Sequence, residues 1–477
     1  MFEYLSFLRP PPEASPLGQP ITFVPQIAND LRTEPCETEY NIYFTWQSDS
    51  GVLHRTGFTK LTTWRSGSGS YKPLSVALPP EARPGDAWRL CLAVNLDPKN
   101  LPQSLVLDLM QHEFGRLPFP VTSLPITVLG GESAGPTGKA RVAKPAPNKQ
   151  PKAKSKHPEA NIPKQERIER AYLLPANWGT LRITEQTSFD LDKKIWDSGV
   201  AVSSWLAKLL ASSGSPGHSH ELVEHFRTRL QLAWGRSREL QIIELGAGTG
   251  LVSLVLGALL ARCKPKVDQT VESYPVVHAR ILATDLSSAI ELIDHNKVFN
   301  SHLFSDGTCV SGETEEPCRA SEIEFQAAQL DWDNPIPPSV WATDPRSGAE
   351  YPFDIIIMAD VTYNTASFGA LLDTITGLLR GPRTSGLSAI VLLAYKCRDS
   401  SERTLWVNAQ TRGIVFIQVD TVKGLDCVKY GGSVGWMNGL RALAPVGVGN
   451  SESVPQRASS TGDKHSYRVN TFCPLTT

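Results

Sequence analysis

From about residue 166 onward, short apolar runs alternate with segments whose apolar residues recur at helical spacing. The apolar runs predict strands over residues 241–245, 280–284, 322–330, 353–359, 387–394, 413–420 and 466–473, with helices beginning near residues 249, 287, 366 and 399. Continuously apolar strands are typical of a sheet that is covered on both faces. The pattern therefore predicts an α/β fold with a mostly parallel, doubly wound sheet.

The first 131 residues show a different pattern. Alternating or β-rich runs occur at residues 40–46, 52–64, 74–78, 88–94, 105–109 and 121–129, and Gly, Pro, Asp and Asn separate them. Short strands with polar turns are typical of a small sandwich or barrel. We therefore predict a β-rich accessory domain over residues 1–131.

Between these two parts, residues 132–165 are rich in Lys, Pro, Ala and Gly and contain almost no apolar residue larger than valine. Such a stretch cannot bury enough surface to offset its chain entropy. We predict a disordered basic linker, with the α/β domain over residues 166–477. A nuclear localisation signal or a phosphate-binding tether is an alternative reading of its lysines.

Composition narrows the class of protein. The 47 basic and 48 acidic residues give a net charge of −1, which argues against a surface built as a whole for nucleic acid. The eight cysteines are scattered without metal-ligand spacing, so we expect free thiols and no metal site. The N-terminus lacks a signal-peptide pattern, and no apolar stretch is long enough to span a membrane. We expect a soluble protein of the cytoplasm, or of the cytoplasm and nucleus.

The most informative motif is Gln-Ile-Ile-Glu-Leu-Gly-Ala-Gly-Thr-Gly at residues 241–250. Its glycines permit a sharp turn and let an anionic group approach the amides at a helix N-terminus. The dinucleotide fingerprint would need a third glycine at position 251, where Leu251 stands. S-adenosylmethionine fits better, because its carboxylate could meet the loop amides while Glu244 faces its amino group. A merely structural strand-to-helix turn is the alternative.

Polar side chains also follow the next two strands, where ligands of such sheets bind. Asp285 follows the second strand and could accept hydrogen bonds from both ribose hydroxyls of an adenosine; a helix-capping acid is the alternative. Asp331 and Trp332 follow the third strand and could border an adenine, unless Trp332 simply fills the core.

Asp360 and Tyr363 follow the fourth strand. A carboxylate and a phenol three residues apart at a strand end can face the same cleft, at the point where a transferred methyl group would emerge. The alternative is an acid that caps the helix near residue 366, although Thr365 is better placed for that role.

These motifs together resemble methyltransferase family 16, the seven-strand enzymes that mostly methylate lysine in non-histone proteins. The resemblance spans about residues 180–420, and its most distinctive mark is the Asp-x-x-Tyr sequence. It rests on the segments at residues 195–199 (Ile-Trp-Asp-Ser-Gly), 244–250 (Glu-Leu-Gly-Ala-Gly-Thr-Gly), 330–332 (Leu-Asp-Trp) and 360–363 (Asp-Val-Thr-Tyr), with a similar aromatic and basic segment at 395–398 (Tyr-Lys-Cys-Arg). It implies a Rossmann-like, seven-stranded class I methyltransferase domain that uses S-adenosylmethionine.

The resemblance also implies roles for individual residues. Glu244 and the glycines would hold the methionine end of the cofactor, Asp285 its ribose, and Asp331 with Trp332 its adenine. Trp196 would cover the cofactor, and Asp360 with Tyr363 would line the acceptor channel as catalytic residues. The cofactor-binding residues implied in this way are Trp196, Glu244, Gly246, Gly248, Gly250, Asp285, Asp331, Trp332 and Ala359.

Insertions at residues 301–320, 334–350 and 431–460 border the substrate side, so they leave the acceptor open. The first function class is a protein-lysine methyltransferase, with arginine or histidine as close variants. The second is a nucleic-acid methyltransferase, which the basic linker favours, although neither Asn-Pro-Pro-Tyr nor Asp-Pro-Pro-Tyr follows the fourth strand. The third is a non-catalytic binding protein with a relic methyltransferase fold. We expect the β-rich domain to recruit or position a protein partner.

Overall fold

The structure is a computed structural model of the 477-residue chain. It describes residues 2–67, 72–95, 101–102, 104–111, 114–130, 162–188, 190–211, 221–234, 239–263, 277–304, 321–343, 348, 350–379, 389–422, 439–441 and 467–472. The predicted linker up to residue 161, the insertion from residue 305 to 320 and the segment 431–460, apart from 439–441, lie outside the described residues.

The C-terminal part contains one eight-stranded sheet, in the order β15-β14-β13-β16-β17-β20-β18-β19. Its strands are β13 (Leu240–Leu245), β14 (Val277–Asp285), β15 (Ser321–Gln329), β16 (Ile355–Ala359), β17 (Ile390–Lys396), β18 (Ile417–Asp420), β19 (Gly439–Arg441) and β20 (Tyr467–Phe472). The first five in the spatial order are parallel, and β20 runs antiparallel to both β17 and β18. The chain moves outward in opposite directions from β13 and β16, so their shared border is the switch point where such sheets bind ligands.

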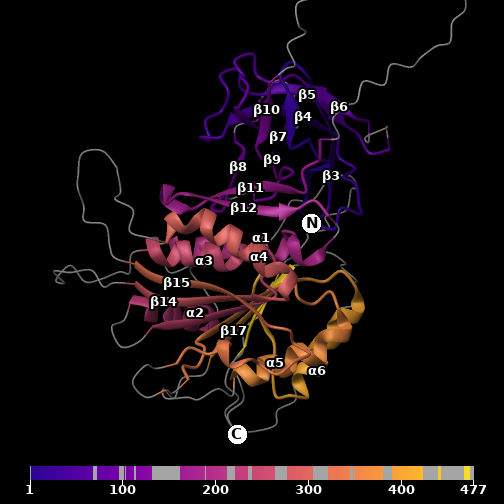
Figure 1. Cartoon of the computed structure of the whole chain (residues 1–477). Helices are drawn as coiled ribbons and strands as arrows, with labels where there is room; N and C mark the ends of the chain where they lie inside the picture. The colour runs from indigo at the N-terminus through magenta and orange to yellow at the C-terminus, as the bar shows by residue number, and fades with distance from the viewer. Residues whose placement is uncertain are drawn as a thin grey trace, which may run out of the picture.

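Helices cover both faces of this sheet (Figure 1), as the alternation of apolar segments predicts. The helices are α1 (Asp197–Ala211), α2 (Glu221–Gln231), α3 (Leu251–Arg262), α4 (Ser287–Asn300), α5 (Phe368–Leu379) and α6 (Thr404–Gln410). Successive residues of the strands pack into different cores: Ile242 lies in the cluster with α1 to α4, while Ile243 lies in the cluster with α5 and α6. The Rossmann-like fold is therefore confirmed.

The N-terminal part is β-rich, as predicted, and consists of a nine-stranded and a three-stranded sheet. Its strands are β1 (Tyr4–Arg9), β2 (Ala14–Pro16), β3 (Ile21–Ala28), β4 (Tyr40–Ser48), β5 (Thr59–Trp64), β6 (Leu74–Val76), β7 (Ala87–Asn95), β8 (Val106–Asp108), β9 (Val121–Ser123), β10 (Ile126–Leu129), β11 (Arg167–Leu173) and β12 (Thr180–Gln186). Side chains from the two sheets share one apolar core, among them Phe7 and Phe23 from one sheet and Trp46 and Leu92 from the other.

The hairpin of β11 and β12 joins the two parts of the molecule (Figure 1). It pairs with β8 and β9 of the N-terminal sheet, and α4 holds its other side. Asn296 accepts from the Thr184 amide at 2.8 Å and donates to its carbonyl at 3.0 Å, and Asn300 does the same for Arg182 at 2.9 and 2.8 Å. The domain limits at residues 131 and 165 stay a prediction. Strand β11, beyond residue 165, pairs with the N-terminal sheet, and two asparagine side chains of α4 hold the backbone of β12.

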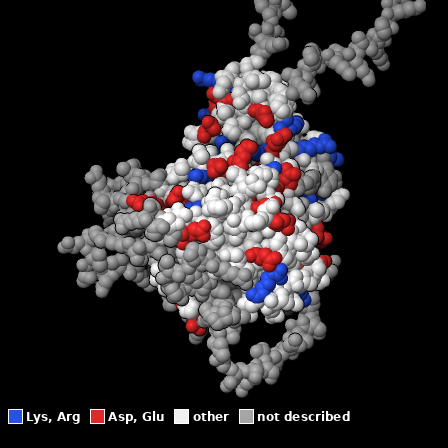
Figure 2. All heavy atoms as spheres, turned by 60° about the horizontal axis from the view of Figure 1, so that its bottom comes forward, with Lys and Arg blue, Asp and Glu red and all other residues white. Residues whose placement is uncertain are grey.

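The described surface carries charges of both signs. On the face turned forward in Figure 2, Asp and Glu side chains are interspersed with Lys and Arg. Among the described residues, no helix is long and apolar enough to cross a membrane. Within the same residues, no group of three or more His, Cys, Asp or Glu side chains is arranged to hold a metal ion.

Candidate active site

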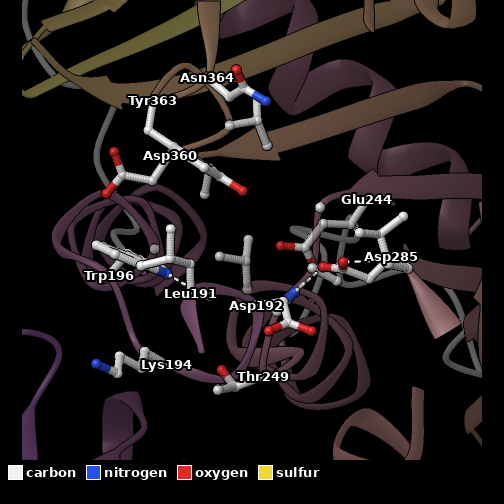
Figure 3. A pocket seen from close by; sticks show the side chains of 18 of the residues that line it. Leu191, Asp192, Lys194, Trp196, Glu244, Thr249, Asp285, Asp360, Tyr363 and Asn364 are labelled. Carbon is white, nitrogen blue, oxygen red and sulfur yellow. Dashed lines mark hydrogen bonds between the residues drawn. The ribbon is translucent and has the colours of Figure 1, made fainter. Parts of the chain in front are cut away.

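A cavity of about 430 Å³ lies at the carboxyl ends of the parallel strands, at the switch point of the sheet (Figure 3). Residues from four parts of the chain line it. They are the glycine loop after β13, the residues at the ends of β14 to β16, the residues that directly follow β16, and residues 191–199 at the start of α1. These segments are distant in sequence and meet only because the strands are parallel.

Most predicted site residues line this cavity. They are Trp196, Glu244, Gly246, Gly248, Asp285, Asp331, Trp332, Ala359, Asp360 and Tyr363. Gly250 does not line it; with φ of 78° it is the N-cap of α3, and an added Cβ would lie 3.3 Å from Ile293 Cγ2. Its glycine identity therefore follows from the turn geometry and close packing. The functional roles of all these residues stay predictions.

The glycine loop makes the sharp turn that the sequence predicts. Gly246 and Gly248 have φ values of 67° and 58°, which glycine adopts without strain. A Cβ on Gly246 would lie 2.8 Å from Val361 Cγ1 and 3.5 Å from Trp332 Cζ2. The loop therefore passes closely beneath the residues that follow β15 and β16.

Two amides of this loop donate to the end of β14, and a third donates within the loop. The Ala247 amide donates to the Thr284 carbonyl at 2.9 Å, and the Gly248 amide donates to Asp285 Oδ2 at 2.7 Å. The Gly250 amide donates to the Ala247 carbonyl at 2.8 Å. The end of β14 thus accepts two of these amides and the turn accepts the third. That the loop amides hold the carboxylate of the cofactor stays a prediction.

Glu244 is buried at the end of β13 and also faces the cavity. Its Oε2 accepts the Ser253 amide at 3.0 Å and the Ser253 hydroxyl. Burial raises the pKa of the Glu244 carboxyl to about 7, although these hydrogen bonds act in the opposite direction. A cationic ligand group beside this carboxyl would favour its ionised form.

Asp285 ends β14 on the opposite side of the glycine loop. Its two oxygens accept from the amides of Gly248 and Leu286, each at 2.7 Å. Burial, assisted by the charge of Asp192, raises its pKa to about 6. The N-cap of α4 is Leu286, so Asp285 is not the capping residue of that helix, and it lines the cavity.

Asp331 and Trp332 form the wall that follows β15. Asp331 accepts from the Asp333 amide at 3.1 Å and from Asn334 Nδ2 at 2.7 Å, which fixes its carboxylate in a tight turn. Trp332 lines the cavity with its ring over Gly246 and also packs against the core beneath α5. Trp332 therefore borders the cavity and also packs at the edge of the core.

Asp360 is buried directly after β16 in a left-handed conformation, with φ of 61°. A non-glycine residue held there stores backbone strain, which is often found at functional sites. Its Oδ1 and Oδ2 accept from the Arg398 guanidinium at 2.6 and 2.9 Å, and Oδ2 also accepts the Ser198 amide at 3.2 Å. It does not cap the helix near residue 366, where the Asn364 side chain accepts the Ala366 amide.

Tyr363 and Trp196 form an aromatic pair at the mouth of the cavity. Their rings are stacked at 9° with centroids 6.5 Å apart, and Tyr363 is 55% exposed. Trp196 donates through Nε1 to the Leu191 carbonyl at 2.9 Å, and the Arg398 guanidinium lies 5.3 Å from its ring centroid. Burial, helped by the charges of Asp285 and Asp192, raises the pKa of Tyr363, so its phenol stays neutral near pH 7.

Arg398 has a role that sequence reasoning did not assign. The segment that contains it was matched to the family, but the pattern did not show that its guanidinium would bind Asp360. The available signal was topological: β16 and β17 are neighbours, so residues just beyond their ends must lie close together.

The sheet order, its antiparallel β20 and the cavity at the switch point define a class I methyltransferase fold, the fold of S-adenosylmethionine-dependent methyltransferases. Residues 176–411 match the family described as lysine methyltransferase. The resemblance found from the motifs is therefore confirmed.

Three solved structures are similar to the chain. The N-methyltransferase NodS from Bradyrhizobium japonicum, in complex with S-adenosyl-L-homocysteine, is 12% identical with a TM-score of 0.24, over 57% of this chain and 98% of that one. A putative RNA methyltransferase from Pyrococcus horikoshii is 12% identical with a TM-score of 0.25, over 59% and 98%. A precorrin-6y C5,15-methyltransferase from Geobacter metallireducens is 11% identical with a TM-score of 0.24, over 55% and 92%. No curated protein sequence matches the chain, so the family rests on the match over residues 176–411.

Proposed function

We propose that this protein transfers a methyl group from S-adenosylmethionine to the lysine ε-amine of a non-histone protein. The observation that carries the proposal is the joint lining of one cavity by Glu244 and Asp285 at one side and by Asp360 and Tyr363 at the other. The first pair suits an amino group and a ribose, and the second pair lies where an acceptor would enter. The family of residues 176–411 supports the choice of lysine.

The residues of the cavity fit the cofactor as follows. Glu244 would accept hydrogen bonds from the α-amino group, since its Oε2 is held by Ser253 and its other oxygen is left for the cavity. Asp285 would accept from the ribose hydroxyls, and Trp332 would border the adenine. When bound, the cofactor supplies a methyl group already activated on a sulfonium, so the protein needs mainly to align the acceptor and exclude water.

Trp196 and Tyr363 suit the acceptor side chain. The alkyl chain of lysine packs well on aromatic faces, and its ammonium group is attracted to them. The amine must lose a proton before it attacks, and an unpaired carboxylate nearby would oppose that loss. Asp360 is paired with Arg398, so it would orient the amine with much of its charge already balanced.

We also propose that the β-rich part positions the protein substrate, and that the protein acts in the cytoplasm or the nucleus. The hairpin of β11 and β12 supports the first point because it holds the β-rich part against α4. The mixed charge of the face in Figure 2 favours a protein over a nucleic-acid acceptor on that face.

The test is methylation of an extract from cells that lack this protein, with purified full-length protein and tritiated S-adenosylmethionine. We expect label in polypeptide that protease removes and nuclease does not, and methyl-lysine in its acid hydrolysate. Heat-treated protein is the control for spontaneous transfer. Label that only nuclease releases would replace the proposal with a nucleic-acid acceptor, and methyl-arginine or methyl-histidine would correct the side chain.

A further inference from the structure

A buried charge cluster joins the β-rich part of the chain to the proposed acceptor site. We call Asp30, Asp197, Asp360, Lys396 and Arg398 the Asp30 cluster. Its carboxylate side chains are at most 2% exposed, and those of Lys396 and Arg398 are 3% and 15% exposed. Asp30 is the only member from the β-rich part; it follows β3, whereas the other four belong to the α/β part.

Arg398 connects Asp30 to Asp360. Its Nη2 lies 2.7 Å from Asp30 Oδ2 and 2.9 Å from Asp360 Oδ2, while its Nη1 lies 2.6 Å from Asp360 Oδ1. The guanidinium is planar, so a partner on Nη2 fixes the orientation of the whole fork. Asp30 therefore helps to fix the plane of the Arg398 guanidinium, which donates to both carboxylate oxygens of Asp360.

The start of α1 is held by the same two carboxylates. The Asp197 amide donates to Asp30 Oδ2 at 3.5 Å, and the Ser198 amide donates to Asp360 Oδ2 at 3.2 Å. The first amides of a helix have no acceptor within the helix, and this end of the helix carries partial positive charge. Asp30 and Asp360 thus meet at one helix end, directly after Trp196 of the cavity wall.

The cluster holds one more acid than base. Lys396 lies 2.9 Å from Asp197 and 3.5 Å from Asp30, and the Tyr4 hydroxyl donates to Asp197 Oδ1 at 2.7 Å. Burial and the charge of Asp30 raise the pKa of Asp197 to about 6. The charges of Lys396 and Arg398 and two hydrogen bonds outweigh burial and lower the pKa of Asp30, so Asp30 stays ionised beside Arg398.

The backbone holds Asp30 rigidly in this place. Asn29 Oδ1 accepts the amides of Thr33 and Glu34, at 3.0 and 3.3 Å, and so closes the loop. Arg32, with φ of 60°, donates to the Thr187 carbonyl at 3.0 Å beyond β12. Neither Asp30 nor Arg398 lines the cavity, so Asp30 acts on it through Arg398 and the start of α1, and Arg398 acts through Asp360 and the ring of Trp196.

We propose that Asp30 is a positioning residue of the acceptor site: it holds the Arg398 guanidinium and thereby fixes the Asp360 carboxylate. The β-rich part is then an integral component of the methyl-transfer site. This inference rests on the proposed function of Asp360, and it concerns how the site is assembled rather than which protein is methylated.

A matched control exists in the same region. Glu169 of β11 is a buried carboxylate that pairs with Arg89 at 2.6 Å and with Arg182, and it does not line the cavity. Loss of its charge disturbs a buried ion pair of the β-rich part without touching Arg398. If Asp30 serves only stability, Asp30→Asn and Glu169→Gln should have the same kinds of effect.

The experiment compares full-length wild type, Asp30→Asn and Glu169→Gln. We expect Asp30→Asn to lower kcat about 10- to 100-fold, because small displacements of aligned groups have effects of this size. Its Kd for S-adenosylhomocysteine, measured by calorimetry, should stay within about threefold of wild type. Glu169→Gln should lower the melting temperature and leave kcat nearly unchanged. A wild-type kcat in Asp30→Asn overturns the proposal, and so does a loss of cofactor binding as large as the loss of kcat.

A second variant covers a failure of Asp30→Asn to fold. Asn29→Ala keeps every charge of the Asp30 cluster and removes the two hydrogen bonds that close the loop carrying Asp30, so kcat should fall while cofactor affinity holds. An unchanged kcat then overturns the proposal. If the wild-type protein methylates no protein, the proposed function is wrong, but this result does not decide the Asp30 proposal. The Asp30 proposal is then judged by the crystal structure of Asp30→Asn, where an unaltered pair of Arg398 and Asp360 overturns it.

Discussion

Ser253 donates its backbone amide to Glu244 Oε2 at 3.0 Å, so the acid that ends β13 also holds the first turn of α3. The sequence motif suggested a ligand-facing acid, and the structure adds that one carboxyl serves a helix and a cavity together. Because Glu244 is buried, with its pKa raised to about 7, its protonation state is open to change by a ligand. We therefore expect both the affinity for the cofactor and the stability of the protein to depend on pH.

The affinity for S-adenosylmethionine should increase as pH rises from about 6 to 8. Only the ionised Glu244 can hold an ammonium group strongly, and burial keeps this carboxyl partly protonated below pH 7. Below its pKa, Kd should fall by up to about tenfold per pH unit. Calorimetry in two buffers of different ionisation enthalpy should also detect a proton released on binding.

In Glu244→Gln, the Kd for S-adenosylmethionine should change much less with pH. Any change of Kd that remains near pH 6 would come from Asp285, whose pKa is raised to about 6. Glu239→Gln is the control, because Glu239 is partly buried beside the start of β13 and does not line the cavity. An equally steep slope in Glu244→Gln would remove Glu244 from the cofactor site.

The same substitution should stabilise the free protein at high pH. A carboxyl whose pKa is raised on folding binds more protons in the folded state, so its contribution to stability is complete below pH 4.5 and is lost as pH rises to about 7. Glu244→Gln avoids this loss, while its amide oxygen can still accept from Ser253. We expect an increase of up to about 3 kcal/mol in the free energy of unfolding at pH 8.

Urea unfolding at pH 5 and pH 8 checks this prediction, with the difference between variant and wild type much larger at pH 8. An increase of the same size at both pH values would point to packing instead of ionisation. Together with weaker cofactor binding, the expected result would identify Glu244 as a residue whose charge serves the ligand rather than the fold.

The glycine loop predicts an order of effects for alanine substitutions. Gly246→Ala meets both a positive φ and a Cβ contact of 2.8 Å with Val361, whereas a Cβ on Gly248 would lie 3.6 Å from its nearest neighbour, the Asp192 carbonyl oxygen. Gly248→Ala should therefore lower stability mainly through the left-handed backbone, by about 1–2 kcal/mol. Gly246→Ala should lower both stability and affinity for S-adenosylhomocysteine more strongly, as measured by thermal unfolding and calorimetry. The reverse order would show that the contact with Val361 relaxes easily.

The sequence predicted the α/β part well because its signals are local. Continuous apolar strands and the residues just after them identified every strand of the described sheet except β19, and the lining residues at the strand ends, since strand ends converge in a parallel fold. The lining residues between 191 and 195 were not predicted. Gly250 was predicted as a site residue but does not line the cavity, because a motif position does not reveal whether a glycine serves a ligand or a turn. The direction of the loop amides was also beyond the pattern, because it depends on how the loop closes against β14.

The β-rich part was predicted less completely. Strand β1 ends shortly before a run of prolines and β3 contains Pro25, so neither resembled a strand, although both have buried partners. Strands β11 and β12 follow the basic linker, so the sequence placed them in the α/β part. The strands with which β11 pairs, β8 and β9, precede the linker. Asp30 gave no signal at all, since it meets Arg398 across 368 residues and no periodicity reports such a contact.

Asp360 offers a final test, because its backbone and its charge can be separated. Asp360→Ala should abolish methyl transfer and leave affinity for S-adenosylhomocysteine within about threefold, since Asp360 serves the acceptor rather than the cofactor. Asp360→Asn is the matched variant: asparagine tolerates φ of 61°, and its oxygen can still accept the Ser198 amide. It lacks the charge that pairs with Arg398, so its kcat should fall about 100-fold, through loss of alignment alone. Steady-state kinetics and calorimetry on both variants decide the role. If cofactor affinity falls in proportion to kcat in Asp360→Asn, the carboxylate acts on the cofactor; if kcat is unchanged, the charge of Asp360 has no part in the transfer.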